Sequence, residues 1–210
     1  MTIVTSLPDP KAKRMFSTVS FVDRGSIATM TKNLDCDEGK WLPSYFKLSP
    51  NAVSEFLGNL MSHLQLKLPG VDVTSEIIST LEQGLGAVLY FVDVTRGMLP
   101  VAFAIVHHGR NTAVVSGTAH VKFLFADDEA AFSQALAGVE CYAHDHCLLH
   151  IEAGVQTANT RALNIMQRLA YKVSVTSSCM VRVDDGIGNS LSYGVPFLDS
   201  EDVFLCADFK

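Results

Sequence analysis

Two stretches of this sequence alternate apolar with ionisable residues, and they hold the side chains best suited to chemistry. The first stretch contributes His120 and Lys122, and the second, further along the chain, contributes His150 and Glu152. Successive side chains of a β-strand point to opposite faces, so each pair would share one face of its strand. If the two strands are neighbours, all four side chains line one groove.

The opposite face of the first stretch is predicted to be apolar. It carries Val115, Gly117, Ala119, Val121, Phe123 and Phe125. A central strand covered by helices is apolar on both faces, so a polar face on such a strand implies water or a cleft.

The polar face offers two interpretations. A histidine beside a carboxylate suits general base catalysis toward an amine or a hydroxyl, because the imidazole titrates near neutral pH. On this interpretation Glu152 and His120 are the candidate catalytic residues. The alternative is structural: a cross-strand ion pair between Lys122 and Glu152, with two half-exposed histidines.

The composition bounds the classes of function. The chain has 210 residues, of which 48% are hydrophobic and 18% charged, and its net charge is −6. These values suit one soluble domain with a substantial core. We expect no nucleic-acid partner, because a phosphate backbone is bound by clustered Lys and Arg. The apolar region from Gly84 to Val106 is interrupted by Asp93 and Arg96, so we expect no membrane span.

Cysteine usage and the first residues indicate a cytoplasmic protein. The five cysteines are scattered and odd in number, which favours free thiols over a disulfide framework. The segment Met1–Pro8 lacks the apolar stretch of a signal peptide. His144, His146 and Cys147 resemble a metal cluster in composition, but histidines two apart on a helix do not face the same way, so we expect no metal site.

The elements that must position these side chains follow from hydrophobic spacing. Ser49-Pro50 starts a helix and Pro69-Gly70 ends it, and a second helix runs from about Thr74 to Gly84. Three apolar runs joined by short polar turns then predict an antiparallel meander, with strands at 87–92, 101–106 and 113–125.

After the meander, a helix and a strand follow each other twice. The first helix buries Phe132, Ala135, Leu136 and Val139. A strand at 148–153 comes next, and a second helix, predicted to be capped by Thr157, leads to a strand at 172–183. Such units imply right-handed crossovers and parallel pairing. The run Val203–Ala207 is predicted to form an edge strand.

The second of these helices carries a motif, Asn159-x-x-Ala162-x-x-Ile165-Met166-x-x-x-Ala170-Tyr171. This motif, with the order of elements from residue 86 onward, resembles the GNAT superfamily of acyl-CoA-dependent N-acyltransferases. The resemblance implies an α/β (α+β) fold with a mixed, mostly antiparallel central sheet flanked by helices and a C-terminal extension.

The expected organisation is a flexible tail followed by one domain. The tail is 1–14, and the GNAT-like domain is 15–210. Within the domain, a first strand and two helices occupy 15–85, the core occupies 86–183, and the C-terminal extension occupies 184–210.

The resemblance also implies ligands. The donor would be acetyl-CoA or another acyl-CoA, and the acceptor would be a small-molecule or peptide amine. The pantetheine arm would lie along the backbone of a few residues, namely Val121, Phe123, Leu124 and Phe125. Asn159 matches the family's coenzyme-contacting asparagine, and its alternative role is that of a helix-start residue. The apolar late strand and C-terminal residues permit a homodimer.

Two positions depart from the family pattern. The family holds the coenzyme's pyrophosphate on a basic, glycine-rich turn at the start of the first helix, where free N–H groups and the helix dipole favour anions. This chain has Asp127-Asp128-Glu129 there. We expect Asp127 to cap the helix, and each carboxylate close to a phosphate would cost a few kcal/mol before screening, to order of magnitude. Met166 stands where many relatives have a tyrosine that protonates the leaving thiolate, and a thioether has no proton to donate.

Two functions therefore remain open from the sequence. One is an N-acyltransferase with a remodelled coenzyme site. The other is a non-catalytic module of the same fold, used for binding, regulation or dimerisation. The acidic turn favours the second function, and the polar groove favours some retained ligand.

Overall fold

The computed structural model describes residues 2–5, 10–18, 21–34, 45–68, 71–93, 99–112, 114–182 and 202–203. Its strands are β1 (Thr2–Thr5), β2 (Phe21–Asn33), β3 (Phe46–Lys47), β4 (Gly86–Asp93), β5 (Leu99–His107), β6 (Thr118–Ala126), β7 (His150–Gln156), β8 (Lys172–Arg182) and β9 (Asp202–Val203). Its helices are α1 (Pro10–Ser17), the short η1 (Pro50–Ala52), α2 (Val53–Lys67), α3 (Thr74–Glu82), α4 (Glu129–Asp145) and α5 (Thr160–Arg168). Within these ranges no helix is long and apolar enough to cross a membrane.

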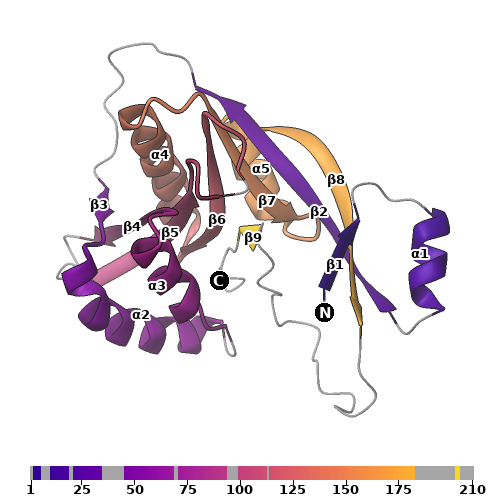
Figure 1. Ribbon diagram of the computed structural model, residues 1–210, viewed down its shortest axis with the longest axis horizontal. Helices are drawn as coiled ribbons and strands as arrows, with labels where there is room; N and C mark the ends of the chain where they lie inside the picture. Colours follow the sequence, from indigo (N-terminus) through magenta and orange to yellow (C-terminus); the bar gives the residue numbers. More distant parts are fainter. Residues whose placement is uncertain are drawn as a thin grey trace.

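The described strands form one sheet, in the order β1-β8-β2-β7-β6-β5-β4-β3, with β9 paired to β6 off this path (Figure 1). The pairings are antiparallel apart from two, because β6 runs parallel to β7 and to β9. The predicted mixed, mostly antiparallel sheet flanked by helices is confirmed. The crossover through α4 joins neighbouring parallel strands, as predicted. The crossover through α5 does not, because the long strand β2 lies between β7 and β8 and pairs with both.

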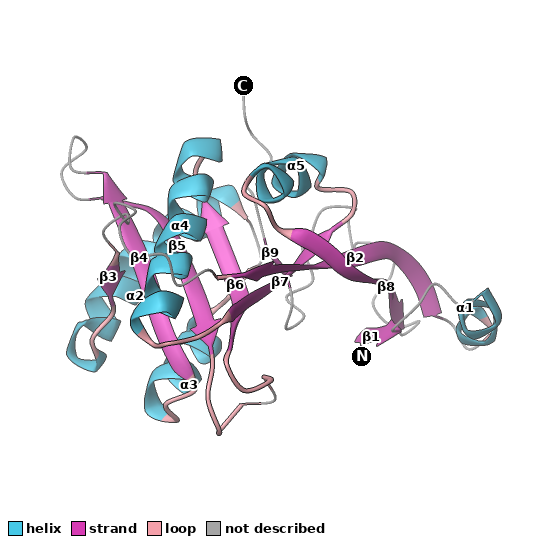
Figure 2. Ribbon diagram, turned by 90° about the horizontal axis from the view of Figure 1, so that it is seen from above, coloured by secondary structure: helices cyan, strands magenta, loops and turns pink. Residues whose placement is uncertain are grey.

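Two helical layers cover the two faces of the sheet (Figure 2). On β5, Ala102 and Ala104 pack with α4 and α5, whereas Phe103 and Ile105 pack with α2 and α3. The strand is apolar on both faces because both faces are covered. The helix residues of the first layer include Phe132, Leu136, Val139, Ile165 and Met166, and those of the second include Phe56, Leu60, Leu64 and Ile77.

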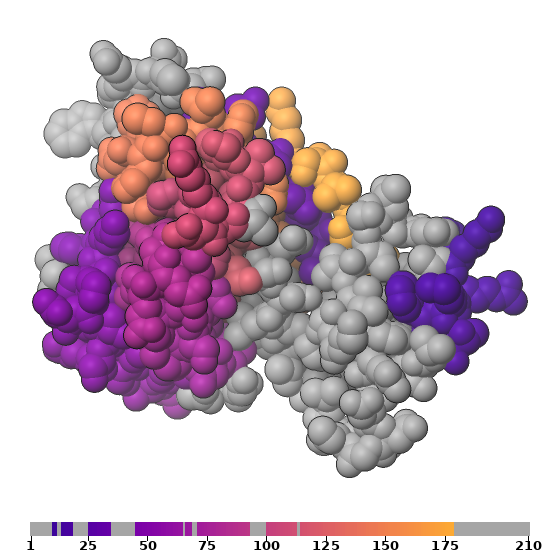
Figure 3. Space-filling model, viewed as in Figure 1, coloured from indigo at the N-terminus to yellow at the C-terminus, as the bar shows by residue number. Residues whose placement is uncertain are grey.

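The strands β2 and β8 extend beyond these layers and carry the amino-terminal elements (Figure 1). β1 pairs with β8 along its whole length, and α1 lies at the far end, at the right of Figure 3. Residues 1–14, which the sequence led us to expect as a flexible tail, include β1 and the first part of α1. The physical reason is that β8 offers unpaired main-chain groups at the sheet edge, which a short preceding segment can satisfy.

Three elements differ in detail from the prediction. β6 begins at Thr118 rather than near residue 113, because Gly117 has a φ of +80°, in the left-handed region. α5 is capped by Asn159 rather than Thr157. β9 lies against β6 inside the sheet rather than at an edge, and the remainder of the predicted strand, from residue 204, lies outside the described residues.

The first helical layer packs closely against the sheet at a glycine of α4. A Cβ on Gly138 would lie 2.2 Å from Cε1 of Phe91 on β4. The Phe91 side chain is 1% exposed, so its ring has no free space to move into. Gly58 on α2 is a contrasting case, because nothing lies within 4 Å of its ideal Cβ.

These two glycines predict opposite effects of one substitution. We expect Gly138→Ala to lower the free energy of unfolding by about 1–3 kcal/mol, since overpacking a filled core displaces its neighbours. Gly58→Ala, in an exposed helix interior, is expected to raise it by about 0.5–1 kcal/mol through helix propensity. Urea unfolding of both variants makes the measurement. Effects of the same sign at both positions would contradict the close packing of α4 on β4.

Candidate functional site

An extra residue in β6 changes the centre of the sheet. Across the β5–β6 ladder, Val106 is opposite Val121 and Ile105 is opposite Phe123. Lys122 is therefore the additional residue of a β-bulge, a feature that bends the strand that carries it and increases its twist.

The bulge also reverses which side chains of β6 face each layer. Val121 and Leu124 pack with α4 and α5, whereas Phe123 and Phe125 pack with α2 and α3. The expectation that Val121, Phe123 and Phe125 share one face is therefore wrong. Strict alternation holds only for a strand without an inserted residue.

The strands β6 and β7 separate at the same point. Their parallel pairing ends where Val121 lies opposite Ala153. Beyond it β7 continues to pair with β2, whereas Phe123 and Leu124 of β6 pair with β9. β9 also contacts β7, so it lies between the separated strands (Figure 1). We call this place, between β6 and β7 beyond Val121, the interstrand slot.

The candidate pair His120 and Glu152 lies just before the interstrand slot. The two residues are opposite each other across β6 and β7, and Nδ1 of His120 is 3.4 Å from Oε1 of Glu152. The hydrogen bond with His120 lowers the pKa of Glu152, so the carboxylate is ionised and accepts a hydrogen bond from Nδ1–H of His120. In a neutral imidazole whose Nδ1 carries the proton, Nε2 is the basic atom.

The other two ionisable residues of the predicted groove are placed differently. Lys122 is the bulge residue. His150 is exposed, and its Nδ1 lies 2.9 Å from Oδ1 of Asn33 on β2. Of the four side chains expected in one groove, the structure thus joins His120 and Glu152 directly.

A third histidine, which alternation alone did not single out, extends this pair. His107 of β5 is opposite His120, so three adjacent strands carry His107, His120 and Glu152 in one row. On the other side, Nε2 of His107 is 2.9 Å from Oγ1 of Thr80 and 3.4 Å from Oε1 of Glu76, both on α3. The register of β5 against β6 is the signal that would have revealed it.

Burial keeps His107 neutral. Desolvation, followed by the charge of Lys122, lowers the pKa of His107 to about 4. The Thr80 hydroxyl donates to the carbonyl of Glu76 at 2.7 Å, so the same hydroxyl accepts from His107 and Nε2 carries the proton. Because the His107 imidazole is neutral, its contact with the Glu76 carboxylate at 3.4 Å is not an ion pair.

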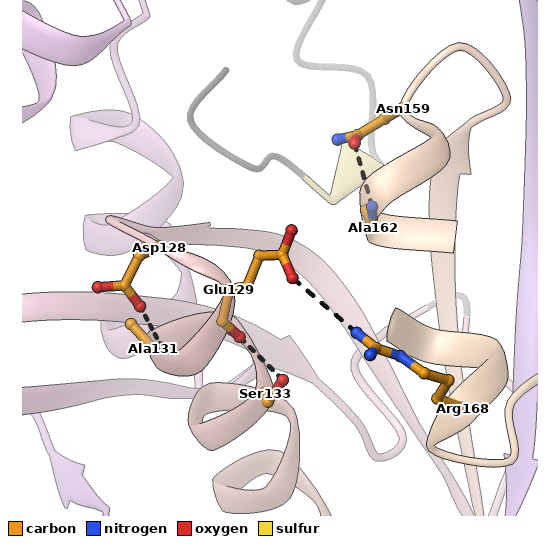
Figure 4. Close-up of polar contacts among 7 residues, drawn as sticks. All are labelled: Asp128, Glu129, Ala131, Ser133, Asn159, Ala162 and Arg168. Atoms are coloured by element: carbon orange, nitrogen blue, oxygen red, sulfur yellow. Dashed lines mark hydrogen bonds and ion pairs between the residues drawn. The ribbon is translucent and has the colours of Figure 1, made fainter. Parts of the chain in front are cut away.

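The N-terminus of α4 is capped by the chain itself (Figure 4). Asp128 is the N-cap, and its Oδ1 accepts the N–H of Ala131 at 2.8 Å. The expectation that Asp127 caps this helix is wrong by one residue, because the Asp127 carboxylate is turned to His63 of α2, at 2.7 Å from its Nε2. An N-terminus that could bind an anion through its free N–H groups is here partly satisfied by a side-chain carboxylate.

The third carboxylate of the turn reaches the neighbouring helix. Oε2 of Glu129 lies 3.9 Å from Nη2 of Arg168 on α5, and both side chains are exposed (Figure 4). An exposed pair of this kind contributes little to stability. Its consequence is that Arg168, the last residue of α5 and a cation near the N-terminus of α4, already faces an acid of this chain.

The motif residues at and near α5 have structural positions in the fold. Oδ1 of Asn159 accepts the N–H of Ala162 at 3.2 Å, so Asn159 is the helix cap, and its amide nitrogen is not used in this bond (Figure 4). Met166 is fully buried among the residues of the first layer. Tyr171 is 2% exposed, and burial raises the pKa of its hydroxyl well above the ordinary value. Neither Met166 nor Tyr171 is exposed to solvent, as an acid that protonates a leaving group would be.

No group of three or more His, Cys, Asp or Glu side chains that could hold a metal ion occurs in the part of the chain that the structure describes. The site consists of main-chain groups along β6, the His107–His120–Glu152 row, and the two capped helix N-termini.

Comparison with known proteins identifies the fold. No protein-family model matches the chain, and no curated protein matches it. Among solved structures, the glucosamine N-acetyltransferase region of a fungal multi-domain beta-N-acetylglucosaminidase aligns with 84% of this chain and 24% of its own, with a TM-score of 0.61 and 11% identity. An acetyltransferase from the GNAT family of Colwellia psychrerythraea aligns with 85% of this chain and 63% of its own, with a TM-score of 0.58 and 9% identity. A GCN5-related N-acetyltransferase from Sphaerobacter thermophilus aligns with 88% of this chain and 62% of its own, with a TM-score of 0.56 and 11% identity.

The chain therefore has the GNAT fold, as the sequence resemblance implied. It spans less than two thirds of each of these three chains. The names of the three proteins describe acetyl transfer, and at 9 to 11% identity the likeness extends to the fold alone.

The low pKa of His107 predicts a pH dependence of stability. The pKa of His107 is about 4 in the folded chain and has its ordinary value of 6.5 in the unfolded chain. Between these two pH values the unfolded chain binds a proton that the folded chain does not. Stability is therefore full above about pH 6.5 and is lost as the pH falls to about 4, by up to about 3 kcal/mol for this group. We expect His107→Gln, whose amide can still donate to Thr80, to remove this part of the slope.

Urea unfolding between about pH 7 and pH 4.5 makes the comparison. His150→Gln supplies the control for the substitution itself, because it makes the same exchange of side chain at an exposed position. Parallel stability–pH curves for His107→Gln and the unmodified chain would show that His107 is not held neutral.

Proposed function

We propose that this chain is a GNAT-type N-acyltransferase that takes an acyl thioester into the interstrand slot. The donor would be acetyl-CoA or another acyl-CoA, and the acceptor a small-molecule or peptide amine. The observation that supports this proposal is the position of the His120–Glu152 pair, on the last paired residues of β6 and β7 before the slot. An acyl group held along β6 would then lie close to a basic nitrogen.

The proposed chemistry uses His120 as the base. An amine is mostly protonated near neutral pH and must lose a proton before it attacks a carbonyl. Nε2 of His120 would take that proton, while Glu152 would hold the ring by its Nδ1–H and stabilise the imidazolium. A C–N bond forms as the C–S bond breaks. The attacking nitrogen releases its second proton to water, and the imidazolium returns its proton to the thiolate, since Met166 has none to give.

The proposed donor would be held mainly by its acyl-pantetheine part. The main chain at Val121 and from Phe123 to Phe125 would bind the pantetheine amides, and the amide nitrogen of Asn159 would donate to the coenzyme. The phosphates would gain little, because the Asp128 carboxylate already caps α4 and Glu129 adds a second negative charge. This arrangement predicts a weak affinity for the coenzyme, because the two carboxylates repel its phosphates.

A non-catalytic GNAT-fold binding module is the second candidate function. The observation that favours it is the same internal cap on α4, because a helix N-terminus satisfied by Asp128 needs no phosphate. Saturable stabilisation by acyl-CoA separates the two candidates. If millimolar acetyl-CoA and longer acyl-CoAs give no thermal shift with any variant below, the second candidate stands.

Removing charge at the acidic turn should strengthen coenzyme binding. Asp128→Asn combined with Glu129→Gln keeps an N-cap of equal quality and removes two negative charges. We expect the dissociation constant of acetyl-CoA, measured by calorimetry, to fall about tenfold, which corresponds to about 1.4 kcal/mol. The control is Glu55→Gln with Glu82→Gln, the same charge change at exposed positions of α2 and α3. An equal gain in both double variants would point to net charge rather than to the turn.

Loss of the carboxylate beside His120 should slow transfer without weakening donor binding. The Glu152 side chain is 38% exposed, so Glu152→Gln should fold. We expect kcat to fall by about 10²–10⁴-fold in an acetyl-transfer assay with a panel of amines, with the donor dissociation constant unchanged. His150→Gln, on the same strand and also exposed, should retain activity. Full activity in Glu152→Gln would remove this pair from the chemistry.

A further inference from the structure

We propose that the interstrand slot is a binding site for an extended peptide strand, and that its occupant is the chain's own C-terminal segment at β9. The pairing is the first observation. Phe123 lies opposite Asp202 and Leu124 opposite Val203, in parallel register, on the edge of β6 that β7 has left. Main-chain N–H and C=O groups in the middle of a sheet need partners, and β9 supplies them.

The location of β9 is the second observation. It contacts β7 as well as β6, so it fills the separation that the bulge at Lys122 creates. The helices α4 and α5 begin just beyond the ends of β6 and β7, and their first turns are capped by Asp128 and Asn159. Both caps are side chains of the chain itself. A peptide strand, whose main chain is uncharged, fits between them without bringing phosphate close to a carboxylate.

The mode of recognition is addition of a strand to an exposed strand edge. In this mode the main-chain hydrogen bonds supply affinity and do not depend on side-chain identity. The sequence around the paired residues, Val203-Phe204-Leu205, is of a kind that favours extended structure. Because the segment is tethered to the same chain, its effective concentration is high, and weak intrinsic pairing is enough for occupancy.

Competition with the acyl donor follows, and this step rests on the proposed function. The groups of β6 that pair with β9 are those that would pair with pantetheine, so the two occupants exclude each other. If the slot is open in about a tenth of the molecules, the apparent affinity for an acyl-CoA is weakened about tenfold. The C-terminal segment would then set how much donor the chain binds.

A main-chain substitution in the full-length chain tests the pairing. Proline has no N–H and is excluded from central pairing. Consecutive strand amides point in opposite directions, so Asp202→Pro with Val203→Pro removes whichever amide faces β6. Asp202→Ala with Val203→Ala is the matched control, because it changes the same side chains and keeps both amides. Amide hydrogen exchange across residues 121–126 reads the occupancy of β6 without any coenzyme.

We expect faster exchange at Phe123–Leu124 in the proline variant, by about tenfold or more, and little change in the alanine variant. A synthetic peptide of residues 198–210, added to the proline variant, should restore protection. Unchanged exchange in the proline variant would overturn the proposal, whether or not acyl-CoA binds.

Calorimetry with acetyl-CoA tests the competition separately. A dissociation constant about tenfold lower in the proline variant than in the alanine variant supports it, and equal constants overturn it. If exchange changes as expected while acetyl-CoA binds neither variant, the peptide site stands and the proposed acyl transfer fails.

Discussion

The insertion of Lys122 into β6 is the local feature on which the rest of the site depends. A regular β6 would pair with β7 along its length and would place every second side chain on one face. With the extra residue, the pairing with β7 ends at Val121 and the faces of Phe123 and Leu124 are exchanged. Both faces are covered by helices, so returning to regular pairing would turn a phenylalanine out of one core and press it into the other. The separation of β6 from β7 is thus fixed by packing on both sides.

The two ends of the site differ in the charges of their side chains. At one end, neutral His107 and the ionised Glu152 flank His120, and the Glu152 carboxylate lies 3.4 Å from Nδ1 of the His120 ring. At the other end, the N-terminus of α4 is capped by Asp128, and its surroundings are acidic. A ligand with an extended, uncharged main part and a reactive end suits this division better than one bound through its phosphates. In this chain the interstrand slot holds β9, a strand of the chain itself.

Much of this arrangement was predictable from the sequence, and the remainder has identifiable causes. Helical spacing predicted the four main helices, and period-two spacing predicted the meander. It also predicted that His120 and Glu152 would line one groove if their two strands were neighbours. The bulge could not be predicted, because Lys122 satisfies strict alternation equally well. His107 became apparent only through strand register, which depends on pairing between distant residues. The expected cap, Asp127, lies one residue before the observed cap, Asp128, because a run of acids leaves the register of a cap open by one residue.

The central claim is that β6 leaves β7 after Val121 and pairs with β9 instead. Nuclear Overhauser effects in the isotope-labelled, full-length chain without ligand measure this directly. The account predicts cross-strand contacts between main-chain protons of β6 and β7 up to Val121 and Ala153, and then contacts from Phe123 and Leu124 to β9. Contacts that continue from Phe123 to Val155, with none to residues 202–203, would contradict it.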